Sequence, residues 1–178
     1  AITGSCGKTS LKELIAKTLK KISSVTYSRK SFNNKYGVPL SLFNLNLRDE
    51  FGIFEIGMDK EGEIGTLSKI VRPDIGVITN ISYAHAKNFK NIKQIALAKS
   101  EIIKNIKDDG AIVLNADDQF YNLLKKIALK RKIRIYSFSM KKKKANIRLN
   151  FIKKEGKKYK IYINVGDQKI YFYTSTNF

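Results

Sequence analysis

The stretch AITGSCGKTS, residues 1 to 10, decides the fold because it reads as a strand, a glycine loop and the start of a helix. Glycines let the backbone curl so that successive N–H groups face one anion, and the helix start adds the positive end of its dipole. The usual eight-residue P-loop has a glycine five places before its second one, and here Ile2 occupies that place. The stretch is therefore a shortened phosphate loop, GxxGKT, with a plain glycine-rich turn as the alternative.

Length and composition indicate one globular domain. The chain has 178 residues, of which 43% are hydrophobic and 28% charged, which is enough to bury a real core. A single cysteine, Cys6, excludes a disulfide framework and favours a reducing compartment. No signal peptide is visible, and a start at the phosphate loop without methionine leads us to expect a fragment of a longer protein.

The net charge of +20 raises the question of nucleic-acid binding, because basic surfaces gain affinity by releasing counterions from phosphate backbones. The lysines, however, are spread over every segment and no RNA-binding aromatic signature is present. The only cluster, Lys141 to Lys144, is interpreted as a solvated loop. We therefore expect no nucleic-acid partner, and no membrane partner because the chain has no long apolar run.

Helix and strand patterns alternate over residues 1–140, which predicts an α/β fold of the P-loop NTPase type. Such alternation favours a mainly parallel sheet with helices on both faces and ligands at the carboxyl ends of the strands. After the first strand we expect strands at 51–57, 75–80, 111–115 and 133–139, and helices over 11–22, 39–47, 63–71, 92–106 and 117–131.

The pattern changes at Ala145. The segments NIRLNFI, KYKIYINV and KIYFYT alternate apolar and polar residues, and the turns EGK and GDQ separate them. Residues 145–178 are therefore expected to form an antiparallel β meander attached to the sheet of the α/β core.

Two charged residues fall inside apolar segments. Glu55 is the only carboxylate in FGIFEIG, and a buried carboxylate must bind a metal or pair with a group such as a lysine. Lys99 shares one helical stripe with apolar residues and is expected to point inward, unless its amine reaches solvent. Burial lowers the pKa of a lysine, and a neutral amine can add carbon dioxide to become a carbamate. The apolar stripe consists of Ile92, Ile95, Ala96, Ile102, Ile103 and Ile106.

Four stretches resemble the central ATPase domain of the Mur ligases: GSCGKTS, SFNNKYGVPLSL, EIGMDKEGEIGTLSKIVRPDIGVITNISYAH and ALAKSEI. The resemblance covers about residues 1 to 118, and the tail is only weakly similar. FNNxxGVPL and ExGMxxxGEI are typical of the member that adds D-alanyl-D-alanine to the muramoyl tripeptide. The resemblance implies that residues 1–178 are the central ATP-binding domain, with the amino-terminal uridine-nucleotide domain and the carboxy-terminal amino-acid domain missing.

The resemblance also implies roles for single residues. Lys8 neutralises charge on the transferred phosphoryl group, and the Thr9 hydroxyl reaches Mg²⁺. Glu55 and His85 serve two Mg²⁺ ions, with Lys99, as a carbamate, helping to place the metal; Lys8, His85 and Lys99 are then the catalytic residues. Asn33 and Asn34 are expected on the substrate side, although asparagines are also ordinary loop builders. The residues expected to bind ATP are Gly4, Ser5, Cys6, Gly7, Lys8, Thr9 and Ser10.

The function implied by the resemblance is ATP-dependent amide-bond formation in peptidoglycan synthesis, in the bacterial cytoplasm and by a monomer. The substrates would be ATP, a UDP-muramoyl peptide and D-alanyl-D-alanine, joined through an acyl phosphate. The chain alone is expected to bind ATP without completing ligation. The alternatives are another Mur-type ligase or folylpolyglutamate synthase, a non-catalytic nucleotide-binding module, and a basic nucleic-acid-binding domain.

Overall fold

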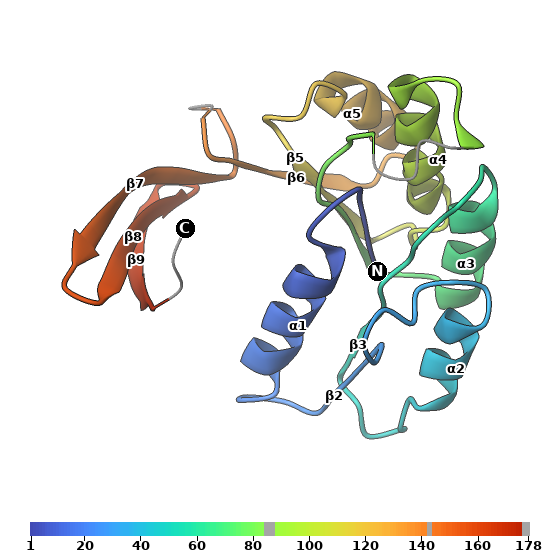
Figure 1. Ribbon diagram of the computed structural model, residues 1–178, viewed down its shortest axis with the longest axis horizontal. Coiled ribbons are helices and arrows are strands. Elements are labelled where there is room, and N and C mark those ends of the chain that lie inside the picture. Colours follow the sequence, from blue (N-terminus) through green and yellow to red (C-terminus); the bar gives the residue numbers. More distant parts are fainter. Residues whose placement is uncertain (84–87, 142–143, 176–178) are drawn as a thin grey trace.

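The computed structural model describes residues 1–83, 88–141 and 144–175, which form an α/β body with a β extension at one side (Figure 1). One seven-stranded sheet runs through both parts in the order β1-β4-β5-β6-β7-β8-β9. Neighbouring strands from β1 to β7 pair in parallel, and β7, β8 and β9 pair antiparallel. The strands of the body are β1 (Ile2–Thr3), β4 (Ile75–Ile78), β5 (Ala111–Asn115) and β6 (Arg134–Ser139).

Helices cover both faces of the parallel strands. Successive side chains of a strand point to opposite faces, and in β4 Ile78 packs into the larger core while Val77 packs into the smaller one. The larger core lies under α3 (Glu63–Val71), α4 (Ile92–Lys104) and α5 (Tyr121–Lys130), and the smaller one lies under α1 (Lys8–Leu19). This confirms the predicted fold class, a mainly parallel sheet between helices.

The segment FGIFEIG is not one strand of the main sheet. Its first part, β3 (Phe51–Ile53), pairs in parallel with β2 (Val25–Tyr27), a short strand that the sequence patterns did not reveal. Beyond β3 the chain stays extended and Glu55 forms an isolated bridge with Ile2. This bridge places the small sheet against β1, so the carboxylate of Glu55 comes to the end of the strand that precedes the phosphate loop.

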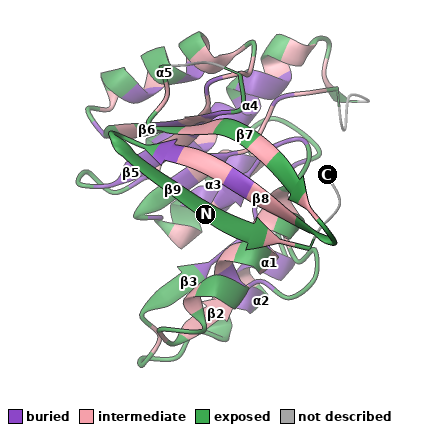
Figure 2. Ribbon diagram, turned by 90° about the vertical axis from the view of Figure 1, so that its left-hand side faces the viewer, coloured by how far each residue is buried: buried purple, intermediate pink, exposed green. Residues whose placement is uncertain are grey.

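The β extension consists of β7 (Ile147–Glu155), β8 (Lys158–Val165) and β9 (Gln168–Thr174), and it confirms the predicted meander. In the described part of the chain, two residue pairs of the sheet join it to β6, Phe138 with Ile147 and Ser139 with Arg148. Figure 2 shows that β8 carries buried residues while β9 is exposed over most of its length. The extension therefore continues the sheet without a helical cover of its own.

Several helix boundaries differ from the expectation. The helix expected over 39–47 is α2 (Gly37–Phe43), so Pro39 still lies in its first turn, as a residue without N–H should. The helix expected from Asp117 begins only at Tyr121, because the carboxylates of Asp117 and Asp118 accept hydrogen bonds from Met140 and Ile81, in the segments that follow β6 and β4. The helix expected over 11–22 is α1 (Lys8–Leu19), so Ile22 lies beyond its end, and both Leu14 and Ile22 are exposed rather than packed.

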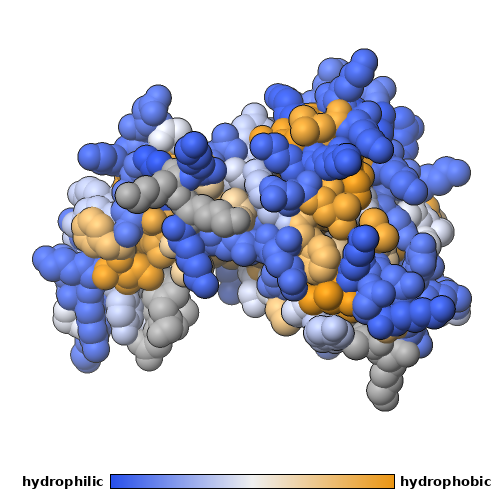
Figure 3. Space-filling model, turned by 90° about the horizontal axis from the view of Figure 1, so that it is seen from above, coloured by the Kyte–Doolittle hydropathy of each residue, from blue (hydrophilic) through white to orange (hydrophobic). Residues whose placement is uncertain are grey.

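The surface is mostly hydrophilic, in keeping with the net charge of +20 (Figure 3). In this view hydrophobic atoms gather in two separate places, on the β extension and on the α/β body. Among the described residues, no helix is long and apolar enough to cross a membrane.

Candidate active site

The phosphate loop joins β1 to α1 through two glycines with positive φ angles. Gly4 has φ +145°, and an added Cβ would lie 1.9 Å from the hydroxyl oxygen of Thr79. Gly7 has φ +79° and precedes the first residue of α1, Lys8. The N–H groups of Lys8, Thr9 and Ser10 therefore lie in the first turn of the helix, where backbone donors have no partner within the helix. This is the arrangement that a phosphate group needs.

The loop is held in place from β4 and the residues that follow it. The N–H of Ser5 donates to the carbonyl oxygen of Asn80 at 2.9 Å, and the N–H of Cys6 donates to the side-chain oxygen of Asn80 at 3.0 Å. The ammonium of Lys8 folds back over the loop and donates to the carbonyl of Gly4 at 2.9 Å. Because the N–H of Cys6 is already used, the amides after it are better placed to receive an anion.

The carboxylate of Glu55 is the centre of a second group of contacts. Its side chain is 1% exposed; Oε2 accepts a hydrogen bond from the Thr9 hydroxyl, and Oε1 accepts one from the Asn33 amide, both at 2.7 Å. The hydroxyl and carboxylate oxygens that the resemblance assigns to Mg²⁺ thus converge. Hard oxygen ligands of this kind suit Mg²⁺, which is commonly held by one or two protein oxygens together with phosphate oxygens.

Lys99 is buried, as its place on the apolar stripe of α4 predicts. The residue is 2% exposed and, within the described part of the chain, has no hydrogen-bond or ion-pair partner. Burial lowers the pKa of its ammonium from 10.5 to about 7; the positive charge of Lys8 acts in the same direction, and Cys6 opposes it. Its carbamylation stays a prediction.

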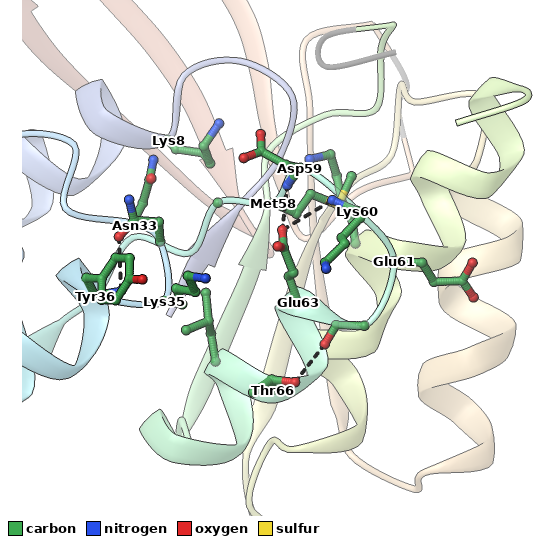
Figure 4. Close-up of a pocket in the computed structure, with 15 residues that line it drawn as sticks. Lys8, Asn33, Lys35, Tyr36, Met58, Asp59, Lys60, Glu61, Glu63 and Thr66 are labelled. Carbon is green, nitrogen blue, oxygen red and sulfur yellow. Dashed lines mark hydrogen bonds between the residues drawn. The ribbon is translucent and has the colours of Figure 1, made fainter. Parts of the chain in front are cut away.

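A pocket of about 660 Å³ lies beside the phosphate loop, and both Lys8 and Lys99 line it. Figure 4 shows Lys8 and Asn33 on one side of it and the first turn of α3, with Glu63 and Thr66, on the other. The carboxylate of Glu63 accepts hydrogen bonds from the N–H groups of Asp59 and Lys60, while Glu61 points away. The pocket is therefore bounded by segments that carry both positively and negatively charged side chains.

The two asparagines of SFNNKYGVPL have different structural roles. Asn34 accepts hydrogen bonds from the N–H groups of Tyr36 and Gly37 and so shapes the start of α2. Asn33 donates a hydrogen bond to Glu55. Its side chain packs against Gly57, where an added Cβ would lie only 2.9 Å from the Asn33 amide. Both also line the pocket, so a role on the substrate side stays a prediction.

The structure does not test every predicted site residue. His85 and the middle of the lysine run 141–144 lie outside the described residues. Within the described ranges there is no group of three or more His, Cys, Asp or Glu residues that could hold a metal by itself. The second metal position, expected at His85, therefore stays a prediction.

Lys12, a fully buried lysine of α1, was not predicted from the sequence. Its ammonium lies 3.9 Å from Oε2 of Glu55 and 3.3 Å from Oε1 of Glu13. The signal was present, because Lys12 precedes the buried Ala16 by four residues and therefore shares its face of the helix. The sequence left two explanations for a buried Glu55, a bound metal ion or a lysine partner. The structure shows a lysine near the carboxylate, and it also shows the contact with Thr9 that is expected of a metal ligand.

Comparison with known proteins connects this geometry to a family. The chain is 40% identical over 144 residues to the UDP-N-acetylmuramoyl-tripeptide--D-alanyl-D-alanine ligase of Buchnera aphidicola subsp. Acyrthosiphon pisum, covering 81% of this chain and 31% of that protein. The crystal structure of MurF from Acinetobacter baumannii matches with a TM-score of 0.88 and 28% identity, covering 97% of this chain and 37% of that one.

A second solved structure contains a nucleotide. MurF from Thermotoga maritima in complex with ADP matches with a TM-score of 0.85 and 28% identity, covering 97% of this chain and 39% of that one. The chain spans about a third of the length of the curated relatives it matches. Residues 2–176 match the Mur ligase middle domain, and the chain therefore belongs to this family.

Proposed function

We propose that the chain is the ATP-binding part of a ligase that joins D-alanyl-D-alanine to UDP-N-acetylmuramoyl-tripeptide in the bacterial cytoplasm. The observation that carries the proposal is the phosphate loop whose Thr9 hydroxyl lies 2.7 Å from a buried carboxylate, Glu55, beside a pocket lined by Lys8 and Lys99. The curated names of the relatives support the choice of this ligase over other Mur-type ligases and folylpolyglutamate synthase.

The residues at the loop fit ATP with Mg²⁺. Amides in the first turn of α1 would receive the phosphates, and the Thr9 hydroxyl and Glu55 carboxylate would hold one Mg²⁺. When bound, the metal neutralises charge on the phosphate oxygens. Lys8, which now folds over the loop carbonyls, would turn toward the γ-phosphate and contribute a further positive charge.

The proposed reaction has two steps. A carboxylate oxygen of the muramoyl tripeptide attacks the γ-phosphorus of ATP, the bond to the bridging oxygen breaks, and ADP leaves. The amine of D-alanyl-D-alanine then attacks the acyl carbon and phosphate leaves, after which the nitrogen loses a proton. Carboxylate and triphosphate repel each other, so the lysines on the pocket wall lower the barrier by bringing them together.

The carbamate at Lys99 belongs to the same proposal. A neutral Lys99 amine forms a bond from its nitrogen to the carbon of carbon dioxide and releases a proton. Its pKa of about 7 supports this, because a large share of the side chain is then neutral at neutral pH. The product is an anion at a site that otherwise gathers positive charge, which suits a role, together with His85, in placing a second metal ion.

A chimera tests the proposal. This chain replaces the matching segment of the Buchnera relative, and phosphate release is measured with ATP, Mg²⁺, the UDP-muramoyl tripeptide and D-alanyl-D-alanine. We expect release that requires both substrates and falls by about 100-fold or more with Lys8→Met. A folded chimera that binds ATP without forming the amide contradicts the proposal. Release with a diamino acid in place of D-alanyl-D-alanine would favour another Mur-type ligase.

The proposal includes no nucleic-acid partner and a monomeric state. The alternative of a basic nucleic-acid-binding domain predicts that the chain binds duplex DNA with an affinity that falls steeply with salt. A salt titration with a labelled duplex separates the two. Binding that falls steeply with salt would favour the nucleic-acid-binding domain, and no binding to the duplex would favour the ligase.

A further inference from the structure

Among the described residues, Lys12 is the most deeply buried cation that the proposed chemistry does not use. It lies on α1, three residues after Thr9, and its exposed fraction is 0%. Burying a lysine is costly unless oxygen atoms replace the water around its ammonium, and Lys12 has such partners. They are the carbonyl oxygen of Lys30, Oε1 of Glu13 at 3.3 Å and Oε2 of Glu55 at 3.9 Å, with the Tyr27 ring at 6.0 Å.

The two carboxylates near Lys12 differ in their exposure to solvent. The side chain of Glu13 is 34% exposed, so water can solvate its charge, whereas that of Glu55 is 1% exposed. The hydrogen bonds to Glu55 come from neutral donors, Thr9 and Asn33. In the described part of the chain, Lys12 is the only cation within 4.0 Å of this carboxylate.

The distance to Glu55 is informative. At 3.9 Å the ammonium attracts Oε2 without donating a hydrogen bond to it, so Oε2 keeps its short bond from Thr9. The ammonium itself is held by the Lys30 carbonyl. Lys30 has φ +48°, a left-handed conformation that is uncommon for lysine, and the loop that follows leads to Asn33. The loop is thus shaped around Lys12 and carries the second donor to Glu55.

We propose that Lys12 is a positioning residue of the metal site. Its charge balances that of Glu55 in the metal-free protein and keeps the carboxylate between Thr9 and Asn33, ready for a divalent cation. The inference rests on the proposed function for the identity of that cation. The pairing of Lys12 with Glu55 is independent of it and can be measured without metal or nucleotide.

The first experiment is a double-mutant cycle in EDTA, read as melting temperatures of the chain. Lys12→Met leaves Glu55 buried without a counter-charge and is expected to lower the melting temperature by roughly 5 to 10 °C. In the background of Glu55→Gln the same substitution should cost less than half as much. Two controls match it: Lys17→Met, at an exposed lysine of the same helix, should change little, and Glu13→Gln should not rescue Lys12→Met.

The second experiment separates a positioning role from mere packing. We compare the melting temperature with ATP and Mg²⁺ against that with ATP and EDTA. Because a divalent cation replaces the lost counter-charge, the gain from Mg²⁺ should be several degrees larger in Lys12→Met than in the unsubstituted chain. The extra gain should vanish in Lys12→Met/Glu55→Gln. A lysine that only packs would lower both melting temperatures equally.

The outcomes decide the proposal. Additive losses in the cycle, or an equal or smaller gain from Mg²⁺ in Lys12→Met, overturn it. If Lys12→Met does not fold, Lys12→Met/Glu55→Gln must restore folding, and failure of both variants also overturns it. If the unsubstituted chain gains nothing from ATP with Mg²⁺, the proposed function fails, while the cycle in EDTA still decides whether Lys12 balances Glu55.

Discussion

At the scale of single residues, Lys99 is held on the apolar side of α4 at an energetic cost. Its ammonium has a pKa of about 7 in the folded chain and 10.5 as the ordinary value, chiefly because of burial. Between these two pH values the unfolded chain binds more protons than the folded one. The penalty is therefore fully present below pH 7 and disappears as the pH rises toward 10.5.

Lys99→Met tests this cost, since methionine fills a similar volume without charge. At pH 6 the variant should be more stable than the unsubstituted chain, by at most about 5 kcal/mol. The difference should shrink steadily between pH 7 and pH 10. Urea unfolding of both proteins in buffer free of carbon dioxide measures it, and a difference that does not change with pH would contradict the lowered pKa.

The buried charges also mark how far single residues could be predicted. Glu55 and Lys99 were predictable because each is one charged residue among apolar neighbours at strand or helix spacing. Lys12 shares a helix face with Ala16 in the same way, yet α1 is too polar overall for one lysine to stand out. The contacts of Asn33 and Lys12 with Glu55 join segments distant in sequence, so a local pattern does not reveal them.

At the scale of elements, α4 holds the start of α3 against the pocket. The carboxylate of Glu101 accepts hydrogen bonds from the N–H of Gly62 at 2.8 Å and of Gly65 at 2.7 Å. Glu101 thereby caps α3 from another helix and offsets the positive end of its dipole. It connects the helix that carries Lys99 with the wall of the pocket.

Glu101→Ala should therefore lower the free energy of unfolding by about 1 to 2 kcal/mol, because two backbone donors lose their partner. Urea unfolding gives the value, with an unchanged slope as a sign that the fold persists. Lys104→Ala, at an exposed position of the same helix, is the matched control and should change little. Equal stability of Glu101→Ala and the control would show that the cap contributes nothing.

The phosphate loop offers a comparison of two glycines. Gly4→Ala places a methyl group 1.9 Å from the Thr79 hydroxyl at φ +145° and should cost about 2 to 4 kcal/mol with loss of ATP binding. Gly7→Ala meets nothing within 4 Å, so only its φ of +79° is unfavourable and the cost is about 1 kcal/mol. Thermal unfolding ranks the two, and the reverse order would contradict the loop geometry.

Elements with a clear period were predicted closely. The bounds of α3, β5 and β8 agree with the segments read from their apolar spacing. β2 was missed because three residues are too few to show a period. The late start of α5 depends on the hydrogen bonds that Asp117 accepts from Ser139, the last residue of β6, and from Met140, which follows it; the sequence of the helix does not contain these partners.

At the scale of the whole molecule, the order of strands and helices brings the candidate residues together at one end of the sheet. Lys8 comes from the start of α1, Glu55 from the segment after β3, and Lys99 from the middle of α4. In parallel α/β sheets the carboxyl ends of the strands are the usual place for ligands. The β extension lies to one side of the α/β body (Figure 1).

Magnesium-dependent binding of ATP to the chain is the most direct test of this account. Calorimetric titration with ATP and Mg²⁺ should give saturable binding that Lys8→Met weakens by about 10-fold or more. Glu55→Gln should still bind ATP in EDTA but gain nothing from Mg²⁺. A folded chain that does not bind ATP, or one whose affinity is unchanged by both substitutions, would contradict the assignment of the loop as the nucleotide site.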